Sequence, residues 1–258
     1  MPRFNLERSR YLERDPSSYR GFTQRRAFVY DLNWNVIVNN WPAFVDGLLL
    51  GLKLAVLGLA FGTIIGLVVA FARTSGKRIL SVPATIYVEI IRNVPLLLLL
   101  FMLYFGLPIF ALQTLPRETA RLLILDGDQS AIVALSIYAG AYLAEIFRAG
   151  IQAVGRRYLD AGRSLGLNRW GVARYVTLPI MFRTVLPSLS NTFISLFKDT
   201  SLAAAIAVPE LTFVTRELST NTFRVIEAWS TAGALYIATC FLIAGILRFL
   251  ERRIRWTV

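Results

Sequence analysis

Five long apolar segments alternate with shorter polar and basic ones along the chain. The first covers about residues 43–72 and the second about residues 82–110. The other three cover about residues 130–149, 181–198 and 228–250. Segments of this length can cross the hydrocarbon core of a membrane as helices. The pattern predicts an all-α membrane protein with about five transmembrane helices.

Positive charges gather at particular ends of these segments. Arg73, Lys77 and Arg78 follow the first one, and a cluster of arginines at residues 248–255 closes the chain. Cytoplasmic loops of membrane proteins carry an excess of Lys and Arg, so both places are predicted to be cytoplasmic. Five spans then put the N-terminal tail outside. The tail's own arginines leave a cytoplasmic tail with a different span count as the alternative.

The chain divides into an N-terminal segment and a membrane domain. Residues 1–42 are polar and arginine-rich, and residues 28–41 mix aromatic and aliphatic side chains with polar ones. We expect this second part to lie in the membrane interface. No apolar stretch follows the first charges closely, so we do not interpret the tail as a cleaved signal peptide. Residues 43–258 form the predicted membrane domain.

Composition narrows the possible functions further. The 258 residues are 55% hydrophobic and carry a net charge of +12, from 28 Lys and Arg against 16 Asp and Glu. Short basic loops explain this charge better than nucleic-acid binding, because no aromatic and basic platform accompanies it. One cysteine, Cys240, and no histidine argue against a disulfide within the chain, a metal site or a Ser-His-Asp triad. We expect no enzyme activity from this chain alone.

Residues 160–179 form a polar and basic insertion between two apolar segments. The first turns have helix-forming spacing, and Gly166 offers a place for the backbone to turn. Leu178-Pro179 puts a proline where a new helix would begin. The insertion is predicted to form two short helices at a bend on the membrane surface.

This insertion resembles the cytoplasmic EAA loop of ATP-binding-cassette (ABC) importer permeases. Asp160-Ala161-Gly162 stands at the EAA position, Gly166 at the family's glycine, and Leu178-Pro179 at its Leu-Pro end. Asp160 replaces Glu and Gly162 replaces Ala. In that family the loop, here about residues 150–179, is a coupling helix that fits a groove of a separate ATPase. The resemblance gives this role to Asp160, Ala161, Gly162, Arg163, Leu165, Gly166, Leu178 and Pro179.

Three further strings resemble permeases for polar amino acids. They are Arg92-Asn93-Val94-Pro95-Leu96-Leu97, Ala144-Glu145-Ile146-Phe147-Arg148 and Lys198-Asp199-Thr200-Ser201-Leu202. The family is the polar amino acid permeases of type I ABC importers, which includes histidine, glutamate, glutamine and general amino acid permeases. The resemblance implies the type I permease fold and a multi-pass protein of the bacterial inner membrane. The Asn93 version of the first string is similar to relatives that accept acidic and neutral amino acids.

The resemblance also implies several partners. They are a pair of ATP-binding subunits, a second permease chain of the same or another kind, an extracytoplasmic amino-acid-binding protein, the amino acid and membrane lipid. No Gly-rich loop ending in Gly-Lys-Ser/Thr occurs in the sequence, so ATP and Mg²⁺ are expected on the partner subunit and no cofactor on this chain. An ion-coupled secondary transporter and a membrane scaffold subunit remain alternative functions.

Polar groups inside the apolar segments are the candidates for substrate contact. Ser136, Tyr142, Asn191 and Ser195 are chosen because an amino acid crossing the membrane needs hydroxyl and amide partners. Bonds to the backbone or to neighbouring helices are the alternative role for each. Pro95 removes a backbone donor, so a kink is expected there.

Three charged groups inside the spans are expected to find partners within the chain. Lys53 is expected to reach toward Asp46, and attraction of an anionic substrate is its alternative role. Glu89 and Arg92 are expected to pair three residues apart.

Overall fold

The computed structural model describes residues 30–255, and all of their regular structure is helical. Residues 30–33 belong to a first unit and form no helix; a second compact unit begins at Trp34. Its first half contains α1 (Asn35–Asn39), α2 (Trp41–Thr74), α3 (Arg78–Asn93), α4 (Leu96–Phe101), η3 (Met102–Gly106), α5 (Leu107–Thr114), α6 (Arg117–Leu122) and α7 (Gly127–Ala153). Its second half contains α8 (Arg156–Ser164), α9 (Arg169–Val172), η4 (Ala173–Thr177), α10 (Leu178–Asp199), η5 (Thr200–Ile206), α11 (Leu211–Thr222) and α12 (Val225–Arg255).

Four stretches of helix are long and apolar enough to cross a membrane alone. They are α2, residues 96–114, α7 and residues 225–253. The run through α9, η4, α10 and η5 is bent by 48° from α11. If this bent pair is counted as one span, the described residues contain five crossings. This confirms the expected multi-pass helical fold with four to five spans. The predicted interfacial residues 28–29 and the arginine-rich tail before them lie outside the described residues.

The second apolar segment is not one helix, which corrects its predicted range of about 82–110. α3 ends at Asn93 and α4 begins at Leu96, with Val94 and Pro95 both extended (ψ 131° and 135°). Pro95 has no N–H to give to a helix, and its ring forces the preceding residue out of the helical region. The spanning part therefore starts after Pro95, while α3 lies against α2 and α7. The Tyr87 hydroxyl donates to the Ile137 carbonyl of α7 over 2.7 Å.

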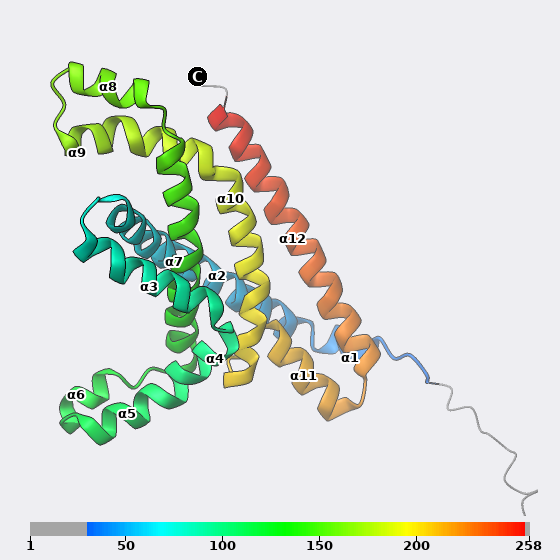
Figure 1. Cartoon of the computed structure of the whole chain (residues 1–258). Helices are drawn as coiled ribbons and strands as arrows, with labels where there is room; N and C mark the ends of the chain where they lie inside the picture. Colours follow the sequence, from blue (N-terminus) through cyan, green and yellow to red (C-terminus); the bar gives the residue numbers. More distant parts are fainter. Residues whose placement is uncertain (1–29, 256–258) are drawn as a thin grey trace, which may run out of the picture. The chain divides into compact units, whose positions relative to one another are not determined.

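The close pair of α2 and α7 forms the centre of the unit (Figure 1). Glycines of α2 face α7: a Cβ placed on Gly58, Gly62 or Gly66 would lie 2.8–2.9 Å from the Cβ of Leu135, Ala139 or Leu143. Glycine lets two membrane helices approach until their backbones touch. The buried core continues from this pair to Leu100 on α4, Met181 on α10 and Ile206 on η5.

Polar side chains cap the N-terminal ends of α7 and α11. Asp126 begins α7 with a capping box, in which its side chain accepts from the Gln129 N–H at 2.7 Å. Glu210 is fully buried and begins α11, where its carboxylate accepts the N–H groups of Thr212 and Phe213 at 2.9 Å. Figure 1 shows α5, α6 and α11 at one end of this unit, and α8, α9 and the end of α12 at the other.

Candidate functional site

The two helices α8 and α9, joined by a tight turn, form an elbow between α7 and α10. Gly166 leaves α8 in the left-handed region at φ +77°, and the Leu167 N–H returns to the Gly162 carbonyl at 3.2 Å. The Gly166 N–H binds the Arg163 carbonyl at 2.9 Å. This pair of bonds is a Schellman ending, which needs glycine at its left-handed residue. The Asn168 side chain then caps α9 by accepting the Gly171 N–H at 2.8 Å.

The inner side of the elbow is packed tightly. Gly162 is buried, and a Cβ at this position would lie 3.1 Å from Val176 and 3.5 Å from Val172. The small residue therefore lets α8 lie against the helix that follows the turn. The continuation through η4 into α10 is unbroken, so Leu178 and Pro179 lie within one helical run and not at the start of a separate helix. Pro179 has no N–H to give to this run, and it directly follows the π-helical turn η4, where the regular α-helical hydrogen bonding is already interrupted.

The outer side of the elbow exposes large apolar side chains among arginines. Leu165 is 82% exposed and Trp170 is 85% exposed, and Tyr158 and Tyr175 are also exposed. Among residues 30–255, Asp160 pairs with the neighbouring Arg163 alone, at 3.2 Å and near the surface. Exposed aromatic and aliphatic groups rimmed by charge are typical of a protein-binding surface. Of the residues expected to couple to an ATPase, Gly162 is buried and Leu178 is half-buried, and the others are exposed: Asp160, Ala161, Arg163, Leu165, Gly166 and Pro179.

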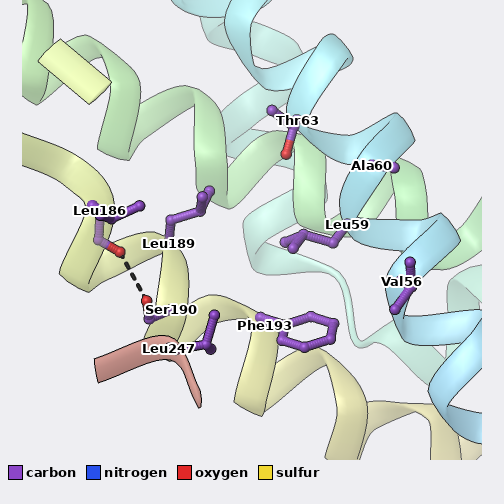
Figure 2. Close-up of a pocket in the computed structure, with 9 residues that line it drawn as sticks. All are labelled: Val56, Leu59, Ala60, Thr63, Leu186, Leu189, Ser190, Phe193 and Leu247. Atoms are coloured by element: carbon purple, nitrogen blue, oxygen red, sulfur yellow. Dashed lines mark hydrogen bonds between the residues drawn. The ribbon is translucent and has the colours of Figure 1, made fainter. Parts of the chain in front are cut away.

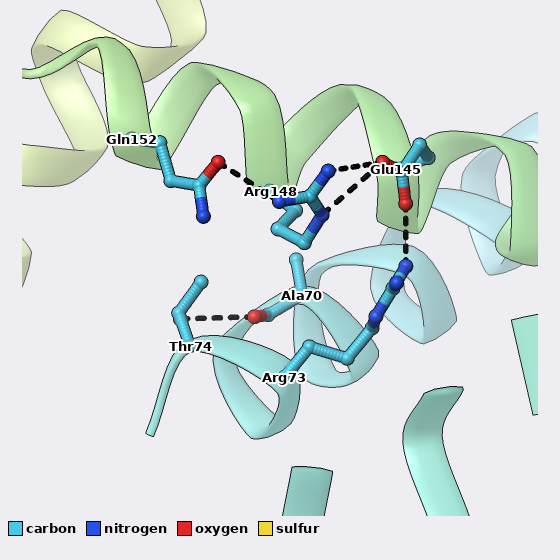
Figure 3. A network of polar contacts seen from close by, with 6 residues as sticks. All are labelled: Ala70, Arg73, Thr74, Glu145, Arg148 and Gln152. Atoms are coloured by element: carbon cyan, nitrogen blue, oxygen red, sulfur yellow. Dashed lines mark hydrogen bonds and ion pairs between the residues drawn. The ribbon is translucent and has the colours of Figure 1, made fainter. Parts of the chain in front are cut away.

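A charged network joins α2 to α7 just before the elbow (Figure 3). The Glu145 carboxylate accepts from Arg73 at 2.5 Å through one oxygen and from Arg148 through the other. Arg148 also donates to Gln152 at 2.8 Å. Arg73 lies in the last turn of α2, while the other three residues lie along the last turns of α7. The network therefore holds the end of α2 against the helix that leads into α8.

A polar cavity of about 350 Å³ lies between α7 and α10. Its polar lining comes from Tyr138, Tyr142, Asn191, Thr192, Ser195 and Asp199. The two tyrosine hydroxyls bind each other at 3.3 Å, with their ring centroids 4.9 Å apart. A volume of this size suits a small metabolite, and the lining offers amide, hydroxyl, phenol and carboxylate groups.

Three of the four residues chosen as substrate contacts meet in this cavity. Tyr142, Asn191 and Ser195 line it, whereas Ser136 does not. Ser136 is buried and its hydroxyl donates to the Ile132 carbonyl at 2.6 Å, which is the helix-internal bond that serine commonly makes in membrane helices.

Sequence reasoning missed Tyr138, Thr192 and Asp199 as lining residues. A signal for two of them exists, because Asn191, Ser195 and Asp199 recur every four residues and Tyr138 lies four before Tyr142. Such spacing places side chains on one helix face.

The expected pairing of the charged residues in α2 and α3 is not found. Glu89 and Arg92 form no ion pair in the described structure, and the Arg92 guanidinium instead lies over the Tyr142 ring, 5.4 Å from its centroid. Lys53 and Asp46 are both exposed and form no ion pair within the described residues. Arg92 therefore lies behind the cavity wall, next to Tyr142, instead of pairing with Glu89 as the sequence predicted.

A second cavity, of about 340 Å³, is apolar and offers little to a charged molecule (Figure 2). Val56 and Leu59 of α2 face Leu186, Leu189 and Phe193 of α10, as the figure shows. The hydroxyls of Thr63 and Ser190 are the polar side-chain groups in this lining. The Ser190 hydroxyl lies 3.1 Å from the Leu186 carbonyl and 2.5 Å from a Glu251 carboxylate oxygen. Of the two cavities, the polar one is the candidate site.

Comparison with known proteins identifies the architecture. The family model described as a binding-protein-dependent transport system inner membrane component matches residues 62–256. The chain is 38% identical over 223 residues to the glutamine transport system permease protein GlnP of Escherichia coli (strain K12), covering 86% of this chain and 98% of that protein. It is 35% identical to the L-cystine transport system permease protein TcyB of Bacillus subtilis (strain 168), covering 86% and 91%.

Solved structures agree with this assignment. A chain of the crystal structure of an amino acid ABC transporter with histidines matches with a TM-score of 0.75 and 31% identity, over 86% of this chain and 99% of that one. A chain of the MetNI methionine ABC transporter in an inward-facing conformation shares the fold, with a TM-score of 0.70 and 19% identity, over 84% and 98%. The chain therefore belongs to the family of binding-protein-dependent transport system inner membrane components, the permease subunits of ABC importers.

Proposed function

We propose that this permease carries amino acids through the cavity between α7 and α10. The observation that carries the proposal is the polar lining of that cavity, in which Tyr142, Asn191 and Ser195 can hydrogen-bond an ammonium, a carboxylate or a polar side chain. Relatives named for glutamine and L-cystine transport support the same substrate class. Polar amino acids, acidic or neutral, are the proposed substrates.

Membership of the family fixes the chain's general role. It is a multi-pass inner-membrane permease and not an enzyme, and ATP hydrolysis belongs to a separate ATP-binding subunit. A substrate-binding protein supplies the transported molecule. An ion-coupled secondary transporter or a scaffold subunit is not favoured by this membership.

The arrangement of partners is part of the proposal. A pair of ATPases would receive the coupling elbows of two permease chains, like or unlike, and ATP and Mg²⁺ would bind to the ATPases. The exposed Leu165 and Trp170 of the elbow support such docking, since the gain from burial against a partner grows with the apolar area removed from water. Closing of the ATPases would move the elbow, and the helices continuous with it would change access to the cavity.

Replacing Gly166 tests the elbow's role in this transport. The substitution Gly166→Pro removes the N–H bonded to Arg163 and cannot adopt φ +77°. We expect normal membrane insertion but loss of ATP-driven uptake of radiolabelled glutamine into liposomes that contain the permease, its ATPase and its binding protein.

Gly76→Pro is the matched control for this test. Gly76 also has a positive φ, of +72°, and empty space around it, but it lies in the turn between α2 and α3. We expect uptake to continue in this variant. Normal uptake by Gly166→Pro, or equal loss in both variants, would contradict the coupling role. Absence of amino acid uptake in the wild-type complex would contradict the proposed substrate class.

A further inference from the structure

Asp199 gives the polar cavity a negative charge that has no obvious use in folding. It is the last residue of α10 and is half-buried in the cavity lining. Its carboxylate makes no hydrogen bond or ion pair with another described residue. The charge of the neighbouring Lys198 acts on this carboxylate without forming an ion pair, and the Lys198 side chain lines a different cavity together with Tyr236 and Cys240.

The position of this carboxylate is energetically unfavourable. Partial burial removes water from the charge without replacing it by donors. A group kept where it costs stability is a candidate for binding a ligand of opposite charge.

Asp199 is the one charged side chain among the described residues that line the cavity. The other polar groups in the lining belong to Tyr138, Tyr142, Asn191, Thr192 and Ser195, and all are neutral. Arg92 stacks over the Tyr142 ring at 5.4 Å from its centroid and is not among the lining residues. A ligand in the cavity would therefore meet the carboxylate of Asp199 directly and the guanidinium of Arg92 only beyond an aromatic ring.

We propose that Asp199 binds the α-ammonium of the amino acid and makes the permease itself select against acidic side chains. The neutral groups and the more distant Arg92 can satisfy one carboxylate, that of the α-carbon. A second carboxylate on the side chain would be repelled by Asp199 at short range. Neutral and cationic amino acids would pass. This inference rests on the proposed amino acid transport. It narrows the proposed substrates by excluding the acidic amino acids that the string containing Asn93 indicated.

Direct binding to the permease–ATPase complex tests this selectivity. The substrate-binding protein is left out, because it makes a selection of its own. Glutamine and glutamate are the probes, since they differ by one amide against one carboxylate. We expect the wild-type complex to bind glutamine on the order of 100-fold more tightly than glutamate at neutral pH, by the repulsion between two close carboxylates.

The substitution Asp199→Asn keeps the size of the side chain and removes its charge. Affinity for glutamine should fall by roughly 10- to 100-fold, the usual loss for a hydrogen bond to a charged group, and the preference over glutamate should shrink to less than about 10-fold. Asp46→Asn on the exposed surface of α2 is the control and should change neither value. An unchanged affinity and preference in Asp199→Asn would overturn the inference.

A second variant tests the same inference if Asp199→Asn does not assemble. Asn191→Asp adds a carboxylate to the same cavity at nearly constant size, and should widen the preference for glutamine by about 10-fold or more. Equal binding of both probes by the wild type, or no binding of glutamine at all, would also overturn the proposal. If the wild type with its binding protein imports amino acids while Asp199→Asn binds glutamine normally, the proposed function stands and only this inference fails.

Discussion

Glu145 joins two helices through two arginines. Its side chain is 30% exposed and that of Arg73 is 12% exposed, so the charges are partly removed from water and each depends on the others. A carboxylate shared by two guanidinium groups is stronger than a single surface pair, because both oxygens accept charge-assisted bonds.

Substituting Glu145 by Gln should therefore destabilise the permease. Two arginines would lose their anionic partner, at a cost of about 1.5–3 kcal/mol. We expect a lower melting temperature of the purified complex and slower ATP-driven uptake, measured side by side. Glu118→Gln is the control, since Glu118 is 89% exposed and lies 4.0 Å from Arg121. An unchanged melting temperature in Glu145→Gln would show that the network is not structural.

Individual site residues were only partly predictable from the sequence. Asn191 and Ser195 stand out because polar groups are rare in a membrane helix, and both line the cavity. Ser136 met the same criterion but bonds its own helix, and the one-dimensional pattern does not separate these outcomes. Asp199 belongs to the string Lys198–Leu202, which was recognised by its resemblance to amino acid permeases and not as a cavity lining. Its role as cavity lining depends on how α10 is rotated against α7, which is set by tertiary packing.

Whole helices were predicted more reliably than single contacts. α2, α7, α10 and α12 follow the apolar segments closely, because a membrane helix needs a length of apolar sequence. The break before α4 was harder: Pro95 marked it, yet a kinked span and two separate helices share the same sequence pattern. Two separate helices form here because α3 packs against α2 and α7, and this tertiary contact is not visible in the sequence pattern.

The glycines of α2 give a test of that packing. Gly62→Val should push α2 away from α7, since a Cβ at this position already lies 2.8 Å from the Ala139 Cβ and 3.2 Å from the Gly140 nitrogen. Overpacking of this kind costs about 1–3 kcal/mol, so a lower melting temperature and a lower yield of folded protein are expected. The control is Gly245→Val in α12, where nothing lies within 4 Å of the added atom. Equal melting temperatures in the two variants would contradict the close α2–α7 contact.

The elbow and the cavity lie on one continuous path through the molecule. η4 follows α9 without a break and leads into α10, whose far end carries Ser195 and Asp199. At the near end, the Glu145 network holds α2 to α7 just before α8 begins. A displacement of the elbow would therefore act on both walls of the cavity, α7 and α10, through rigid helices instead of flexible loops.

Such a transmission requires the elbow to be held by the ATPase, and Trp170 is the side chain best placed to do so. It is 85% exposed in the described structure, and aromatic groups buried at interfaces often contribute most of the binding energy. Trp170→Ala should weaken binding of the ATPase to the permease by about 2 kcal/mol, roughly 30-fold in Kd, measured with the purified subunits. The melting temperature of the permease alone should not change, because the side chain packs on little of its own chain.

Leu122→Ala is the matched control for this measurement. Leu122 is similarly exposed but lies on α6, at the opposite end of the membrane unit (Figure 1). Equal weakening by both variants would indicate a general effect of surface apolar groups, and undiminished ATPase binding by Trp170→Ala would place the docking surface elsewhere. Weakening by Trp170→Ala alone, with uptake falling in proportion, would show that the elbow carries the work of ATP hydrolysis into the membrane.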